Sequence, residues 1–162
     1  MMTMPLHMVR DDEVRTLVIV DMQSQGFPLA RSAMRGVKQE SRLAMERGWH
    51  IIVVEYDLDC AGETDSDLLE LLTGYARVHR VKKAHDDGSR EVVDFCAEHA
   101  LPTGVFRLVG VMTDVCVAQT AAGLVGLLSA SSVEVVKSAC ACAFSRYDWN
   151  TFPSHERISI VD

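Results

Sequence analysis

The chain has 162 residues, of which 48% are hydrophobic and 24% are charged, and its formal net charge is −7. This length fits one globular domain, expected over residues 1–162, and the negative charge argues against a nucleic-acid partner or an anionic membrane surface. No apolar run reaches the roughly 18 residues that a membrane-spanning helix needs.

Apolar runs alternate with segments of helical periodicity along the whole chain. TLVIVD (16–21) predicts a buried strand, and residues 30–48 place apolar side chains at helical spacing until Gly48 ends the pattern. The alternation continues to the end of the sequence. Further strands are predicted over 50–57, 78–81, 105–111, 132–139 and, as a sixth, 157–162, and further helices over 66–72, 89–100 and 113–128.

The predicted strands are apolar along their entire length, which is typical of a parallel sheet that is covered on both faces. Strands that alternate with helices indicate the same architecture. We therefore expect one doubly wound α/β domain with a five- or six-stranded, mainly parallel sheet and helices on both faces.

Ligands of such sheets bind at the carboxyl ends of the strands, near the point where the strand order reverses. Several chemistry-bearing side chains follow predicted strands at this edge. They are Asp21, Asp57, Asp59, Lys82, Lys83, Thr113, Asp114 and Cys116. An acid, a lysine and a thiol on neighbouring strand ends indicate a nucleophilic site.

Common cofactor and catalytic motifs are absent from the sequence. It contains no GxGxxG, no GxxxxGK[ST], no GxSxG and no CxxC. These absences argue against dinucleotide binding, a phosphate loop, a serine hydrolase and a dithiol redox pair. We expect no cofactor.

Three segments carry a family resemblance: VIVDMQ at 18–23, the lysine after the third strand, and GVMTDVCV at 110–117. Together, and in this order, they resemble the isochorismatase-like cysteine hydrolases. This superfamily includes nicotinamidases, N-carbamoylsarcosine amidohydrolases and ureidoacrylate-type amidases. The resemblance extends from about residue 16 to residue 140, and its most specific part is the G-x-x-T-D-x-C-V segment.

The resemblance implies a catalytic triad of Asp21, Lys83 and Cys116. Lys82 stays an alternative to Lys83, because the two are adjacent and successive strand residues face opposite sides. A helix N-terminus and a nearby ammonium favour the thiolate, so we expect the pKa of Cys116 to be lowered. Asp21 would accept the thiol proton and later donate it to the leaving amine.

The resemblance also implies an oxyanion site beside a cis peptide bond that aligns with Val111–Met112. Val111, Met112 and Gln23 are thus the candidate oxyanion and substrate-binding residues. Nicotinamidases of this superfamily bind a divalent metal ion through an aspartate and two histidines after the second strand. The corresponding segment here, residues 55–67, contains no histidine, so we predict no catalytic metal.

The loops that build the substrate pocket look shorter than is usual for the superfamily. AHDDGS (84–89) replaces a longer, aromatic-containing segment, and CAFSRYDWNTFPSHE (142–156) leaves little room for a helix. A neighbouring subunit would then supply pocket walls, so we expect a homo-oligomer. Five aromatic residues are candidates to line a pocket or an interface: Phe27, Phe144, Tyr147, Trp149 and Phe152. The alternative is that they pack under a surface loop.

The expected function is that of a cysteine-dependent amidohydrolase that cleaves a C–N bond of a small amide, ureide or carbamoyl compound. The alternatives are a family member that has lost its reaction and serves as a binding or assembly subunit, or a thiol redox sensor based on Cys116. MMTMPLHMVRDDEV at the start lacks the pattern of a signal peptide, and five cysteines in no regular framework indicate a reducing compartment. We therefore expect a cytoplasmic protein.

Overall fold

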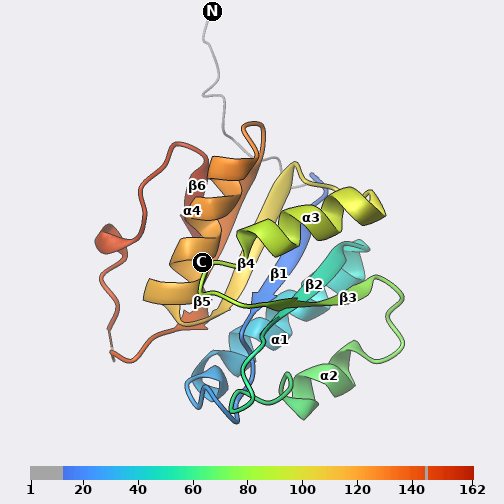
Figure 1. Ribbon diagram of the computed structural model, residues 1–162, viewed down its shortest axis with the longest axis vertical. Helices are drawn as coiled ribbons and strands as arrows, with labels where there is room; N and C mark the ends of the chain where they lie inside the picture. Colours follow the sequence, from blue (N-terminus) through green and yellow to red (C-terminus); the bar gives the residue numbers. More distant parts are fainter. Residues whose placement is uncertain (1–12, 145) are drawn as a thin grey trace, which may run out of the picture.

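The computed structural model describes residues 13–144 and 146–162 (Figure 1). Most of the segment in which no signal peptide is expected, residues 1–12, lies outside the described residues. No described helix is long and apolar enough to cross a membrane. The strands are β1 (Thr16–Val20), β2 (His50–Tyr56), β3 (Val78–Lys83), β4 (Val105–Val111), β5 (Ser132–Ala141) and β6 (Ile158–Val161).

These strands form one sheet in the order β3-β2-β1-β4-β5-β6, and every neighbouring pair is parallel. The prediction of five or six mainly parallel strands is therefore confirmed, with six. The chain runs outward from β1 to β3 and then returns to place β4 on the other side of β1. The strand order thus reverses between β1 and β4, where side chains at the carboxyl edge can surround a ligand.

Helices cover both faces of the sheet. Figure 1 shows α3 (Ser89–His99) and α4 (Ala118–Leu127) over the face toward the viewer, with α1 (Ala30–Arg47) behind the sheet. The short α2 (Ser66–Leu72) joins α1 on its face. Successive strand residues supply two separate cores, because Val18 and Val20 pack with α3 and α4 whereas Leu17 and Ile19 pack with α1 and α2. Continuous apolar strands follow from this double coverage.

A glycine allows α1 to approach the sheet closely. A β-carbon at Gly36 would lie 2.1 Å from the main-chain oxygen of Ser138 in β5, so any other residue would push the helix away. At the end of α1, Gly48 adopts the left-handed conformation and its N–H donates to the last turn of the helix. The predicted stop at Gly48 is confirmed.

The segment after β4 differs from the single helix predicted over 113–128. It begins with one π-helical turn, Thr113–Val117, and only then continues as α4. A π-turn inserts an extra residue into the helical ladder, and such turns are frequent at functional sites. Here it holds Cys116 in the turn that directly follows β4.

Candidate active site

Asp21 is the first residue after β1, in the middle of the sheet. Its N–H donates to the main-chain oxygen of Val54 in β2, and its backbone adopts a left-handed conformation with φ of 52°. Few residues other than glycine, asparagine and aspartate tolerate that conformation. The residue is 1% exposed, and the Lys83 and Cys116 side chains both favour the charged form of its carboxyl group.

Lys83, the last residue of β3, reaches over to Asp21. Its Nζ lies 3.0 Å from Asp21 Oδ2, donates to the main-chain oxygen of Asp86 at 2.7 Å, and sits 4.5 Å from the centre of the Tyr56 ring. Lys83 is 1% exposed, whereas Lys82 is exposed. Of the two adjacent lysines, the one expected in the triad is the one that contacts Asp21.

Close packing at the start of α3 holds the Lys83 side chain in place. A β-carbon at Gly88 would lie 3.1 Å from Cδ of Lys83, so a larger residue would press on the lysine stem. The N–H of Gly88 donates to the hydroxyl of Thr120 in α4, which ties the loop after β3 to that helix. The position of the ammonium is therefore determined by β3, by the loop that follows it and by α4, to which that loop is bonded.

Cys116 lies beside this ion pair in the π-helical turn and is 6% exposed. Its Sγ is 4.0 Å from Asp86 Oδ1, and Asp86 Oδ1 also accepts a hydrogen bond of 2.9 Å from the hydroxyl of Tyr56. Both Asp21 and Lys83 act on the thiol electrostatically. An acid, an ammonium and a thiol from β1, β3 and the turn after β4 thus meet at the carboxyl edge.

The expectation that the pKa of Cys116 is lowered is wrong. Burial and then the neighbouring charge of Asp21 raise the pKa of Cys116 to about 12, and the opposing effect of Lys83 is smaller. The pKa of Asp21 is also raised from its ordinary value, chiefly by burial, while the charge of Lys83 lowers it. The resting site therefore holds a protonated thiol next to the Asp21 carboxyl group, whose charged form Lys83 favours.

This arrangement can move a proton from sulfur to oxygen without solvent. A thiol beside an ionised carboxylate loses its proton when a developing bond at sulfur lowers the cost of the thiolate. The ammonium of Lys83 compensates the negative charge both when it lies on the Asp21 carboxylate and when it lies on the Cys116 sulfur. Nucleophilic chemistry in this site would thus be base-assisted at the moment of attack.

Gln23, a candidate oxyanion or substrate-binding residue, bonds to main-chain groups of the protein. Its side chain is fully buried, donates to the main-chain oxygens of Tyr56 and Gly62, and accepts the N–H of Tyr56 at 2.7 Å. These bonds use both ends of the amide. Gln23 therefore positions Tyr56 and the loop after β2, and its role in oxyanion or substrate binding stays a prediction.

The peptide bond between Val111 and Met112 is cis, as expected. Val111 is buried, and the main-chain oxygen of Met112 accepts the N–H groups of Val115 and Val117 in the π-helical turn. These bonds fix the path of the chain between β4 and Cys116. The oxyanion role of this segment stays a prediction.

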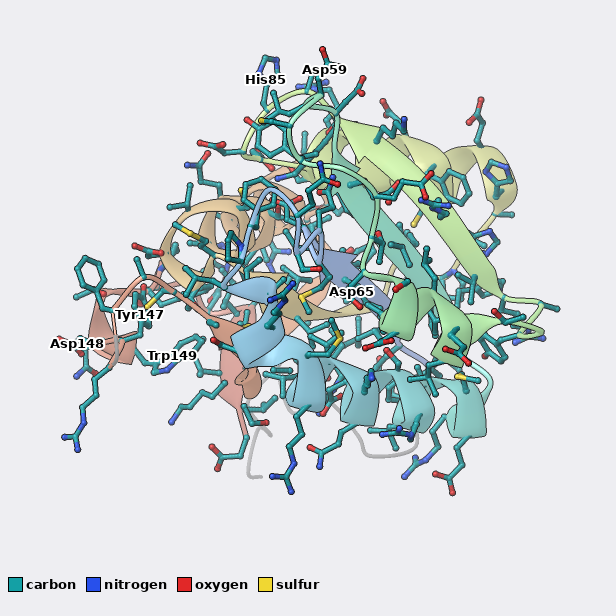
Figure 2. The ribbon with its side chains drawn as sticks, turned by 90° about the horizontal axis from the view of Figure 1, so that it is seen from below. Asp59, Asp65, His85, Tyr147, Asp148 and Trp149 are labelled. Atoms are coloured by element: carbon teal, nitrogen blue, oxygen red, sulfur yellow. The ribbon has the colours of Figure 1, made fainter. Side chains whose placement is uncertain are left out.

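A cavity of about 500 Å³ opens at the same edge, next to the end of β5. It extends from Thr113, close to Cys116 in sequence, to three of the predicted aromatic side chains, Phe144, Tyr147 and Trp149. Figure 2 shows Tyr147 and Trp149 together on one side of the molecule, away from Asp59 and His85. Phe27 packs against one core, and Phe152 is part of the other, against which Tyr147 and Trp149 also pack. Phe144 is 67% exposed, and the expected homo-oligomer stays a prediction.

The residues after β2 do not fit the metal site that nicotinamidases carry there. Asp57 is exposed, and the segment 55–67 supplies no histidine. Within residues 13–144 and 146–162, no three histidine, cysteine, aspartate or glutamate side chains lie close enough to share a metal ion. Zinc and similar ions need at least three such protein ligands.

Sequence reasoning missed Asp86 and Tyr56, the two residues that face the thiol from the loop after β3 and the end of β2. The only signal was the pair of aspartates in AHDDGS, which directly follows Lys83. Nothing in the sequence indicates which of the two turns inward. In the structure Asp87 accepts the N–H of Ser89 at the start of α3, and Asp86 faces Cys116.

The two lysines provide a prediction about this site. Lys83→Ala should lower the free energy of unfolding by about 3 kcal/mol, because it leaves a buried carboxylate without its partner. It should also raise the pH at which Cys116 reacts with iodoacetamide, since the lysine charge no longer favours the thiolate. Denaturant unfolding and alkylation against pH measure the two effects.

Lys82→Ala is the matched control, because Lys82 is the exposed neighbour in the same strand. It should change neither the stability nor the pH dependence of alkylation. The reverse behaviour of the two variants would place Lys82 in the site.

No protein-family model and no curated protein matches the sequence. Among solved structures, a nicotinamidase from Staphylococcus aureus has a TM-score of 0.76 at 18% identity, covering 91% of this chain and 97% of that one. An N-carbamoylsarcosine amidase from Thermoplasma acidophilum has a TM-score of 0.73 at 17% identity, covering 92% and 96%. An isochorismatase-like hydrolase from Alkaliphilus metalliredigens follows with 0.70 at 14%, covering 92% and 94%. The chain therefore has the isochorismatase-like fold.

Proposed function

We propose that the chain is a cysteine-dependent amidohydrolase that cleaves a C–N bond of a small amide, ureide or carbamoyl compound. The observation that carries this proposal is the buried Lys83–Asp21 ion pair beside the Cys116 thiol, at the point where the strand order reverses. A buried ion pair of this kind adds little to stability by itself. Perturbed pKa values beside a nucleophile are instead typical of catalytic sites.

In the proposed reaction Asp21 accepts the proton of the Cys116 thiol as sulfur attacks the carbonyl carbon. The carbonyl oxygen becomes an oxyanion, which main-chain N–H groups near Met112 and Cys116 would stabilise. The C–N bond then breaks, and the nitrogen leaves with the proton that Asp21 held. Water attacks the resulting thioester with Asp21 as base, which releases the acid and restores the thiol.

The fold comparisons support the same class of reaction, because two of the similar structures are named as amidases of small compounds. The test is an ammonia-release screen over amides, ureides and carbamoyl compounds, with the Cys116→Ala variant as the blank. Release that depends on Cys116 supports the proposal. A ligand that binds at this site in the screen but is never hydrolysed would favour the binding-subunit alternative.

Activity found in this screen should survive metal chelation. The donor set after β2 does not fit a metal ion, so no step needs one. Rates measured before and after dialysis against EDTA should agree within about twofold. Loss of turnover that added zinc or iron restores would show that a metal site has been missed.

The pH dependence of turnover should reflect the raised pKa of Asp21. Asp21 accepts a proton only when it is ionised, so kcat/KM should fall as the pH drops through that pKa, which lies above the ordinary 3.8. In Lys83→Ala the fall should begin at higher pH, because the lysine charge lowers the pKa of Asp21. An acid limb at or below pH 3.8 would contradict the assignment of Asp21 as base.

A further inference from the structure

The side chain that faces Cys116 from the loop after β3 is a carboxylate. Asp86 Oδ1 lies 4.0 Å from the sulfur and is held by the hydroxyl of Tyr56 at 2.9 Å. Its main-chain oxygen is used separately, as the acceptor of Lys83. The side chain of Asp86 is thus not needed to place the lysine, and it faces the sulfur, the atom that a substrate must approach.

Formal charges around the thiol do not balance. Asp21 and Asp86 are negative and Lys83 is positive, so the site carries one excess negative charge while Cys116 is protonated. The charge of Asp86 is felt at the site, since it contributes to the raised pKa of Asp21. Unit charges that lie close together interact strongly in a partly buried environment. A positive group on the substrate would neutralise the excess negative charge of the site, whereas a carboxylate would add to it.

Hydrogen-bond acceptors are also in excess. Oδ2 of Asp21 lies 3.0 Å from the Lys83 ammonium, whereas Oδ1 of Asp21 and, in the half-buried Asp86, Oδ2 have no hydrogen-bond donor among the described residues. The Lys83 ammonium already contacts Asp21 and the main-chain oxygen of Asp86. A buried acceptor without a donor, such as Oδ1 of Asp21, is costly, so a ligand that brings N–H groups is favoured over one that brings oxygens.

We propose that Asp86 selects the substrate, and that the site takes amides or ureides bearing a cationic or N–H-rich group, such as an ammonium or guanidinium, next to the scissile bond. This inference rests on the proposed function, of which it names the substrate class. Asp86 binds the positive group through its carboxylate, and Tyr56 holds that carboxylate in position. Carboxylate-bearing substrates are disfavoured by repulsion from the same group.

A thiol-modification experiment tests the charge selection without any substrate. Three methanethiosulfonates of similar size, with a trimethylammonium, a neutral and a sulfonate end, each convert the thiolate into a mixed disulfide and release a sulfinate. The experiment uses a Cys60→Ser background, because Cys60 is exposed. Mass analysis of the peptide that contains Cys116 gives the rate for each reagent.

The cationic reagent should react at least about tenfold faster than the anionic one, and Asp86→Asn should reduce this ratio about tenfold. Asp87→Asn is the matched control, because that carboxyl accepts the N–H of Ser89 instead and should leave the ratio unchanged. Tyr56→Phe retains the charge and should retain a preference for the cation. If Asp86→Asn does not fold, Asp86→Ser removes the same charge.

An unchanged ratio in Asp86→Asn or Asp86→Ser would overturn the proposal, and so would a Cys116 that none of the three reagents reaches. A matched series of amides with ammonium, neutral and carboxylate ends then separates the two proposals. If the reagent ratio shifts but no amide is hydrolysed, the charge selection holds and the hydrolase proposal fails. If amides are hydrolysed with the same preference in Asp86→Asn, the selection by Asp86 fails and the hydrolase proposal holds.

Discussion

Replacing Cys116 by alanine is expected to abolish turnover of every amide substrate while the protein stays folded. The substitution removes only the sulfur from a buried site, so the free energy of unfolding should change by about 1 kcal/mol, a typical effect of a point mutation. Without sulfur no thioester can form, and neither Asp21 nor Lys83 can replace the nucleophile. Ammonia release and denaturant unfolding of the same preparation measure both quantities.

Cys96→Ala is the matched control for this variant. Cys96 is equally buried, in α3, and burial raises the pKa of its thiol to about 11. The same atoms are removed from a similar environment, so stability should change comparably while turnover is retained. Full activity in Cys116→Ala would show that this cysteine only packs, and the proposed mechanism would fail.

Asp21→Asn is expected to lower kcat by a factor of 10²–10⁴, the usual contribution of a general base. Asparagine has nearly the same shape and tolerates the left-handed backbone conformation that Asp21 adopts, so the strand end should keep its geometry. Its amide cannot accept the thiol proton. The loss should therefore appear in kcat, with the circular dichroism spectrum unchanged.

Asp57→Asn provides the comparison, because Asp57 also follows a central strand but is exposed. Its rate should match that of the unmodified protein. An Asp21→Asn variant with a rate within threefold of the unmodified protein would show that another group accepts the proton.

The fold could be predicted from the sequence because each strand is buried on both faces. Segments such as TLVIVD and HIIVVEYD are apolar throughout, and periodicity separates them clearly from the helices. The meeting of Asp21, Lys83 and Cys116 followed from the same pattern, since Asp21 directly follows β1, Lys83 ends β3 and Cys116 lies in the turn after β4. The π-helical turn at Thr113–Val117 could not be read, because one inserted residue leaves the apolar pattern almost unchanged.

The electrostatics of the site could not be predicted from the sequence. Lys82 and Lys83 are equivalent in composition, and only the register of β3, in which Lys83 pairs with Tyr56, decides which of them is buried. The direction of the pKa shift of Cys116 depends on how deeply three distant segments bury it together. Asp86 faces the thiol through a loop conformation that no periodicity encodes.

The high pKa of the Cys116 thiol has a consequence for how the protein withstands oxidants. Peroxides oxidise thiolates and barely react with thiols, so sensor cysteines combine a low pKa with exposure to solvent. Cys116 has the opposite combination, with burial and the charge of Asp21 keeping sulfur protonated. This environment disfavours its use as a redox sensor. In the proposed hydrolase, a nucleophile that becomes reactive only in the presence of its substrate would be protected from sulfenic acid formation between turnovers.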